Sequence, residues 1–135
     1  MSEVELLRRE VIEDAPVVEK IGSRFYPGEL ATVSRPKYPC ANFSFTGGVP
    51  DADIKDIGMK TFKIWAWAKG DQGGYDKTRE IHKAIRDVID NKRFADTDCY
   101  VVFKMTGEPL DYYEAIDGIY ATTGVFRVRV IQTSG

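Results

Sequence analysis

The stretch that decides the fold class is Thr61–Ala68, with the sequence TFKIWAWA. Every second residue is apolar or small: Phe62, Ile64, Ala66 and Ala68. A period of two predicts a β-strand that buries one face. The opposite face carries Trp65 and Trp67, flanked by Lys63 and Lys69. Two tryptophans are unusual on a face that is exposed to solvent. The stretch therefore predicts a half-buried strand whose outer face is aromatic.

Three further stretches alternate in the same way. Residues 41–46 precede the quoted strand and end at Gly47-Gly48, while residues 99–105 and 125–131 follow it. These segments predict three more strands, so that the sheet has four strands or slightly more.

Helical spacing dominates elsewhere. Apolar residues recur at steps of three and four from Tyr75 to Asn91, after a glycine-rich turn, and predict one long helix. The pair Ser2 and Glu5 has the spacing of a capping box, and predicts a first helix that ends near Glu13. A short second helix is expected from Asp14, as its N-cap, to Gly22.

The predicted order is therefore α-α-β-β-α-β-β. This order predicts an α+β fold in which the helices pack on one face of an antiparallel sheet. Two long loops are expected beside it, over residues 23–39 and 107–123. No linker or repeat divides the chain, and residues 1–135 are expected to form a single domain.

Charge and composition exclude several classes of protein. The 135 residues carry a formal net charge of −2, so no basic footprint for nucleic acid exists. No apolar run reaches the roughly 18 residues that a membrane helix needs, and the acidic start lacks the features of a signal peptide. Cys40 and Cys99 stand singly, which favours free thiols in a reducing compartment. We expect a chain that stays on the cytoplasmic side of any membrane.

Few residues suggest catalysis. The single histidine, His82, lies beside the apolar stripe of the long helix, and no nucleophile elbow, zinc motif or phosphate-binding loop is present. The sequence therefore predicts no catalytic, cofactor or metal site.

The second long loop carries an acidic series, one residue in three: Glu108, Asp111, Glu114 and Asp117. Such a series can bind a cation or act in acid–base catalysis, but turn dipeptides interrupt it and a calcium-loop pattern is missing. An acidic loop that contacts a partner, or lines a surface past which DNA slides, is the favoured interpretation. Arg127 and Arg129 are candidate partners for these carboxylates, in the same chain or in a neighbouring one.

Aromatic residues are the strongest indication of an interface. They gather on the outer face of the quoted strand and in the second loop, at Trp65, Trp67, Tyr112, Tyr113 and Tyr120. Such residues are enriched at the centres of interfaces, although filling of the core is an equally open alternative. With two long loops on a small sheet, this distribution favours a self-associating ring or cap over a free monomer.

The whole pattern resembles the tail-terminator, or tail-completion, proteins of long-tailed bacteriophages. The resemblance lies in DAPVVEKIGSRFYP (residues 14–27), Tyr38-Pro39 entering a strand, IWAW (64–67), Gly74-Tyr75 opening a helix, and FRVRV (126–130). It covers nearly the whole chain except the extended segment 107–123.

The resemblance implies a non-enzymatic virion protein that is assembled in the host cytoplasm. Similar proteins form a hexameric ring on the head-proximal end of a finished tail tube, stop its growth and offer a docking surface to the head connector. Such a ring needs two different complementary patches on each subunit. The candidates are the Trp65/Trp67 face, Arg127 and Arg129, and the loops from Tyr26 to Pro36 and from Glu108 to Tyr120.

DNA passes through such a ring, and a basic lining would hold its phosphates. We therefore expect the acidic series to face the channel. Two alternatives remain: a neck or head-completion connector protein, and a small cytoplasmic enzyme with His82 near its site.

Overall fold

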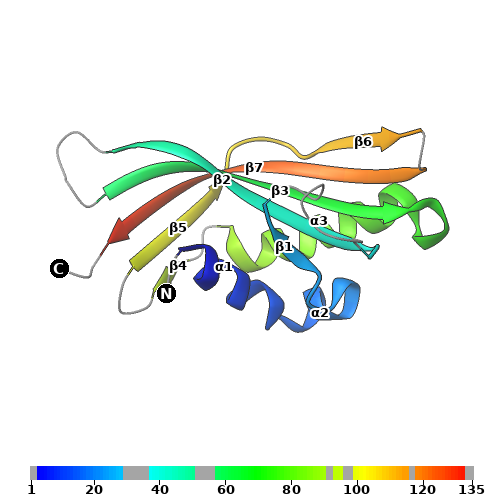
Figure 1. Cartoon of the computed structure of the whole chain (residues 1–135), viewed down its shortest axis with the longest axis horizontal. Coiled ribbons are helices and arrows are strands. Elements are labelled where there is room, and N and C mark those ends of the chain that lie inside the picture. Colours follow the sequence, from blue (N-terminus) through cyan, green and yellow to red (C-terminus); the bar gives the residue numbers. More distant parts are fainter. Residues whose placement is uncertain are drawn as a thin grey trace.

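The computed structural model describes residues 3–28, 37–50, 57–90, 93–95, 99–115 and 118–132. A sheet forms one layer and the helices form the other (Figure 1). In chain order the elements are α1 (Glu3–Ile12), α2 (Ala15–Ile21), β1 (Phe25–Pro27), β2 (Cys40–Pro50), β3 (Ile57–Lys69), the short 3-10 helix η2 (Gly70–Gln72), α3 (Gly74–Ile89), β4 (Arg93–Ala95), β5 (Cys99–Met105), β6 (Leu110–Glu114) and β7 (Ile119–Gln132).

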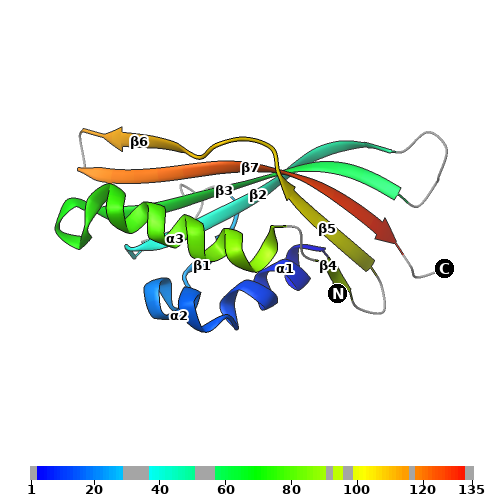
Figure 2. The same ribbon diagram turned by 180° about the vertical axis from the view of Figure 1, so that it is seen from behind.

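The sheet has seven strands in the order β1-β2-β3-β7-β5-β4, and β6 also pairs with β7. Every pairing is antiparallel except the parallel pair β1–β2. All of α1, α2 and α3 lie on one side of this sheet, as the view from behind also shows (Figure 2). The predicted α+β class and helix placement are confirmed, and the sheet is larger than the four strands expected.

Two of the three extra strands, β1 and β6, lie in the predicted loops, and the third, β4, lies between the predicted long helix and the strand that follows it. Residues 25–27 form β1 beside β2, and the acidic segment contains β6 and the start of β7. The prediction of a loop over 107–123 is wrong, because residues 110–114 pair with residues 119–123 of β7. The predicted strand end at Gly47-Gly48 is also wrong, since β2 continues to Pro50 through a register shift between Thr46 and Val49.

The strands β5, β6 and β7 form one long hairpin, in which β5 and β6 make up the first arm and β7 the second. Both β5 and β6 pair with β7, Met105 opposite Phe126 and Leu110 opposite Thr123. Between these two pairs the first arm has four residues, 106–109, and β7 has only two, Gly124 and Val125. Residues 106–109 therefore form a bulge. The Thr106 amide and hydroxyl both donate to the carbonyl oxygen of Val125, at 3.0 Å, and hold the start of this bulge.

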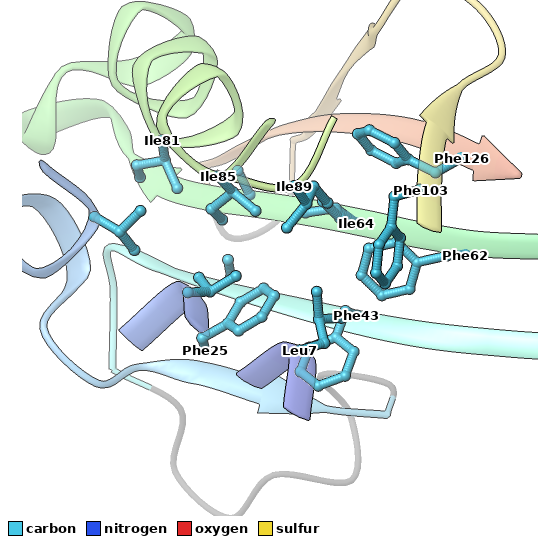
Figure 3. Close-up of a cluster of buried hydrophobic side chains, with 14 of the residues drawn as sticks. Leu7, Phe25, Phe43, Phe62, Ile64, Ile81, Ile85, Ile89, Phe103 and Phe126 are labelled. Carbon is cyan, nitrogen blue, oxygen red and sulfur yellow. The ribbon is translucent and has the colours of Figure 1, made fainter. Parts of the chain in front are cut away.

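The hydrophobic core lies between the helices and the sheet (Figure 3). Helix α3 contributes Ile81, Ile85 and Ile89, which occupy one stripe at four-residue intervals. Phenylalanines from the sheet meet them, with ring centroids 4.4 to 6.0 Å apart along Phe25, Phe43, Phe62 and Phe126. Leu6, Leu7, Val11, Val17 and Ile21 of the first two helices close the cluster. The centre of this face of the sheet is therefore buried beneath the helices where the structure describes it.

The first two helices begin and end close to the predicted positions. Asp14 has an extended backbone at the N-cap of α2, and Gly22 ends it with a φ of 60°. The expected capping box includes Ser2, which lies outside the described residues.

The two cysteines stand far apart in the sheet. Cys40 pairs with Trp67 of β3, whereas Cys99 pairs with Gln132, beyond the opposite end of β3. About ten residues of strand, roughly 30 Å, separate these places, so a disulfide is excluded. Burial raises the pKa of the Cys40 thiol to about 12.

Candidate functional site

The face of the sheet opposite the helices, here called the open face, carries a row of aromatic rings. Trp67, Trp65 and Tyr112 form this aromatic row across β3 and β6. The two indoles stack with centroids 5.5 Å apart, and Tyr112 lies 5.3 Å from Trp65. Their neighbours in β3, Phe62, Ile64 and Ala66, point into the core, so the predicted alternation is confirmed.

Hydrogen bonds orient one end of this row. The Trp67 indole Nε1 donates to Asn42 Oδ1 at 2.6 Å, and Asn42 Nδ2 donates to the carbonyl oxygen of Gly28 at 2.9 Å. Tyr26 stands opposite Asn42 in the register, and therefore on the same face. The buried amide thus fixes the orientation of the Trp67 indole, on which the Trp65 ring stacks.

Apolar surface continues from the row toward the hairpin. Leu110 is 58% exposed, Tyr112 49% and Val125 36%. Leu110 pairs with Thr123, and Val125 lies two residues farther along the same face of β7. These side chains form a contiguous apolar strip with nothing over it in the described chain, a feature typical of interaction surfaces.

Cations border this strip on the same face. Lys63, Lys104, Arg127 and Arg129, here called the basic row, all point away from the helices. Lys104 stands directly opposite Arg127, an arrangement of like charges that destabilises a sheet. The sequences of β2, β3, β5 and β7 contain no aspartate or glutamate. The carboxylate that β6 places on this face, Glu114, stands opposite Ile119, eight residues along β7 from Arg127. Lys63 Nζ instead lies 4.9 Å from the centroid of the Trp65 ring.

The remaining predicted tyrosines lie on the other side of the sheet. Tyr113 and Tyr120 are cross-strand partners on the helix side, with centroids 4.7 Å apart. Tyr75 of α3 meets Tyr120 edge to face, also at 4.7 Å. Tyr120 thus helps attach β7 to α3, while Tyr113 remains 52% exposed at the border.

The acidic series does not form one surface. Successive strand residues point to opposite faces, so a spacing of three separates Asp111 from Glu114. Asp111 accepts hydrogen bonds from the Arg79 guanidinium and from the Thr122 hydroxyl. The hydrogen bond from Arg79 has the largest effect on the pKa of Asp111, and together with the bond from Thr122 it lowers that pKa. Glu108 and Glu114 are exposed, and Asp117 lies outside the described residues.

Arg127 and Arg129 do not meet these carboxylates. The carboxylate of Asp111 forms its salt bridge with Arg79 of α3. Within the described ranges no salt bridge joins Arg127 or Arg129 to an acidic side chain. Pairing inside the chain is therefore excluded for the described carboxylates, and pairing with a neighbouring chain stays a prediction.

His82 lies at a pocket of about 310 Å³ between α3 and the bulge, with Arg79, Arg86 and Glu108 at its walls. The imidazole is 2% exposed, and burial, assisted by Arg86, lowers its pKa to about 4. Its Nε2 has no hydrogen-bond partner in the described structure. This nitrogen lies against Gly124, where an added Cβ would come within 2.3 Å of it.

The arrangement around His82 is not that of a catalytic base. The nearby hydroxyls of Thr78 and Thr122 bond each other at 2.7 Å, and Thr122 also bonds Asp111. The His82 imidazole packs against β7, and no hydroxyl in the described chain is hydrogen-bonded to it. A base must form such a hydrogen bond to activate a hydroxyl nucleophile.

The described residues contain neither a cluster of metal ligands nor a membrane-spanning helix. No group of three histidine, cysteine, aspartate or glutamate residues there is placed to hold a metal ion. In that same part of the chain, no helix combines the length and the apolar character needed to span a membrane.

The predicted site residues did not include four residues of the open face: Lys63, Lys104, Leu110 and Val125. The signal for Lys63, Lys104 and Val125 was present, since all three alternate with buried residues of predicted strands. Leu110 was missed because its segment was assigned to a loop.

Comparison with known proteins gives a fold without a family. No family model and no curated protein matches the chain. Among solved structures, it is similar to a chain described as "Virion of native gene transfer agent (GTA) particle", with a TM-score of 0.73 and 15% sequence identity. The match covers 96% of this chain and 95% of that chain. At this identity the two chains share a fold over almost their whole lengths.

Proposed function

We propose that the chain is a structural virion protein that forms a ring on the head-proximal end of a phage tail tube. In this role it stops growth of the tube and provides the surface to which the head connector docks. The observation that carries the proposal is the open face, where a partly exposed aromatic row and a predominantly basic row have no cover among the described residues. A monomer gains nothing from this arrangement, whereas a ring buries it between subunits.

The likeness to a chain from a virion supports the same class of function. It agrees with the resemblance of residues 14–27 and 126–130 to tail-terminator proteins. The proposed partners are further copies of the chain, in a hexamer, together with the tail tube protein and the head connector. The proposed activity is assembly, without catalysis or a cofactor, because His82 is buried, neutral and unpaired with a nucleophile in the described chain.

Electron microscopy of tails assembled without this protein tests the proposal. Tails of greater than normal length support the terminator role. Tails of normal length that lack heads contradict it, and instead support a neck or head-completion connector. Purified tubes and heads offer a second test, since a terminator binds finished tubes before heads.

The acidic residues that remain free are proposed to border the DNA channel. Glu108 and Glu114 are exposed and have no salt bridge in the described structure, whereas Asp111 is neutralised by Arg79. Replacing both by glutamine is expected to leave the mass of the ring unchanged and to slow DNA delivery, since a less acidic lining retains phosphates longer. Unchanged infectivity of particles that carry both substitutions contradicts the channel assignment.

A further inference from the structure

The outer surface of α2 is a second region that the fold leaves uncovered. Val17 and Ile21 point into the core, while Val18, about 100° around the helix from Val17, is 44% exposed. Pro16 and Glu19 beside it are also exposed. The helix therefore presents a small apolar centre to the outside.

Carboxylates surround that apolar centre. Glu13, Asp14 and Glu19, here called the acidic patch, have no salt bridge in the parts of the chain that are described. The nearby arginines of α1 are already engaged: Arg8 Nε donates to the carbonyl oxygen of Phe25 at 3.0 Å, and Arg9 pairs with Glu10. Lys20, in the last turn of α2, is the one cation of this helix. Three carboxylates against one lysine leave the surface of α2 and its N-terminal flank net acidic.

The acidic patch and the basic row lie on opposite sides of the molecule. The helix layer, with α2 on its outside, covers one face of the sheet, and the open face looks the other way (Figures 1 and 2). Each region has an exposed apolar centre, Val18 in one and Leu110 with Val125 in the other. Their net charges are opposite, because the open face is predominantly basic while three carboxylates outnumber Lys20 around α2.

The exposed side of α3 is a weaker candidate for such a contact. Lys83 pairs with Asp87 at 3.2 Å, and Arg79 pairs with Asp111. Three of its charged residues are thus paired inside the chain, and its remaining charges, Asp76, Lys77, Glu80 and Arg86, are two of each sign. The helix therefore offers no net charge for a partner to complement.

We infer that the open face of one copy docks on the acidic patch of the next copy, head to tail. This inference rests on the proposed ring, and names the two surfaces that meet in it. A contact between different patches repeats from subunit to subunit and closes when the rotation allows. A standard interface takes about 800 Å² from each partner, so a subunit with 7755 Å² of accessible surface has room for both. Opposite charges across the contact also fix which surfaces meet.

Paired charge reversals test the inference directly. One variant carries Arg127→Glu and Arg129→Glu, and the other carries Glu13→Lys and Glu19→Lys. Each variant alone presents two surfaces of like charge, and is expected to associate at least about a hundredfold more weakly than the wild type, because like charges face each other in the contact. Sedimentation velocity at several protein concentrations measures the loss.

An equal mixture of the two variants is expected to recover association. The acidic open face of the first variant meets the basic α2 surface of the second, and the unchanged surfaces also match. The product is an alternating ring with an even number of subunits. Lys83→Glu and Glu80→Lys, on the exposed side of α3, serve as single-reversal controls and are expected to keep the wild-type mass.

Three results overturn the inference. Variants that retain the wild-type mass show that other surfaces hold the ring, and a mixture that stays dissociated shows that these two surfaces do not meet. A wild-type chain that remains monomeric up to millimolar concentration also contradicts it. The proposed function fails separately, when tails made without the protein have normal length.

Discussion

The two faces of the sheet differ in what covers them. On the helix side, Phe62 and Phe126 are buried in the core and have no solvent exposure. On the open side, Trp65 and Tyr112 are held in order yet remain accessible, with cations around them. The covered face therefore accounts for the stability of the subunit, while the open face has the chemistry of an interface. Adjacent residues of one strand, β3, serve both purposes.

The largest expected difference between the faces concerns Phe62 and Trp65. Phe62→Ala opens a cavity among packed rings and is expected to lower the free energy of unfolding by about 3–5 kcal/mol. Trp65→Ala removes a half-exposed ring and is expected to cost about 1–2 kcal/mol, yet to abolish self-association. Chemical denaturation and sedimentation of both variants measure the two effects. Equal losses of stability would contradict the division between the faces.

Protonation of His82 gives the next largest effect. The pKa of the buried imidazole is about 4, below the ordinary value of 6.5, so the unfolded chain binds a proton first as the pH falls. Stability is full above pH 6.5, decreases between 6.5 and 4, and the total loss is about 3 kcal/mol. His82→Leu is expected to remove this dependence, as followed by denaturation at successive pH values. An unchanged pH profile in His82→Leu would show that another group titrates.

The contact between His82 and Gly124 predicts a smaller cost. Gly124→Ala forces the helix and β7 apart and is expected to destabilise the fold by about 1–3 kcal/mol. Adding His82→Ala makes room for the new methyl group and is expected to recover part of the loss. Thermal unfolding of the single and double variants gives the coupling. Additive losses would mean that the two residues do not share this space.

Asp111 gives the smallest effect, because its salt bridge with Arg79 is exposed to solvent. The bonds from Arg79 and Thr122 lower the pKa of Asp111, so their contribution is present above the unfolded pKa and is lost as the pH falls through the folded one. Asp111→Asn is expected to show a slightly shallower decrease of stability in acid than the wild type, while its self-association is unchanged. A loss of association in this variant would extend the interface to the helix side of the hairpin.

The sequence predicted the covered face well and the open face in part. Alternation in β3 and helical spacing in α3 are local patterns with a direct physical cause, so the core residues followed from them. The strand β6 was missed because turn residues and charges concealed its alternation, and its pairing with β7 depends on tertiary contacts. The engagement of Asp111 by Arg79 joins residues 32 positions apart, and no local pattern indicates it.

Both tryptophans of the chain lie on the open face, so their fluorescence reports on that face alone. The most direct test is acrylamide quenching of this fluorescence, measured together with sedimentation mass as the protein concentration rises. If copies cover the open face, quenching decreases in step with the increase in mass. A rising mass with unchanged quenching, or no rise in mass at all, would contradict the claim that this face is buried between subunits.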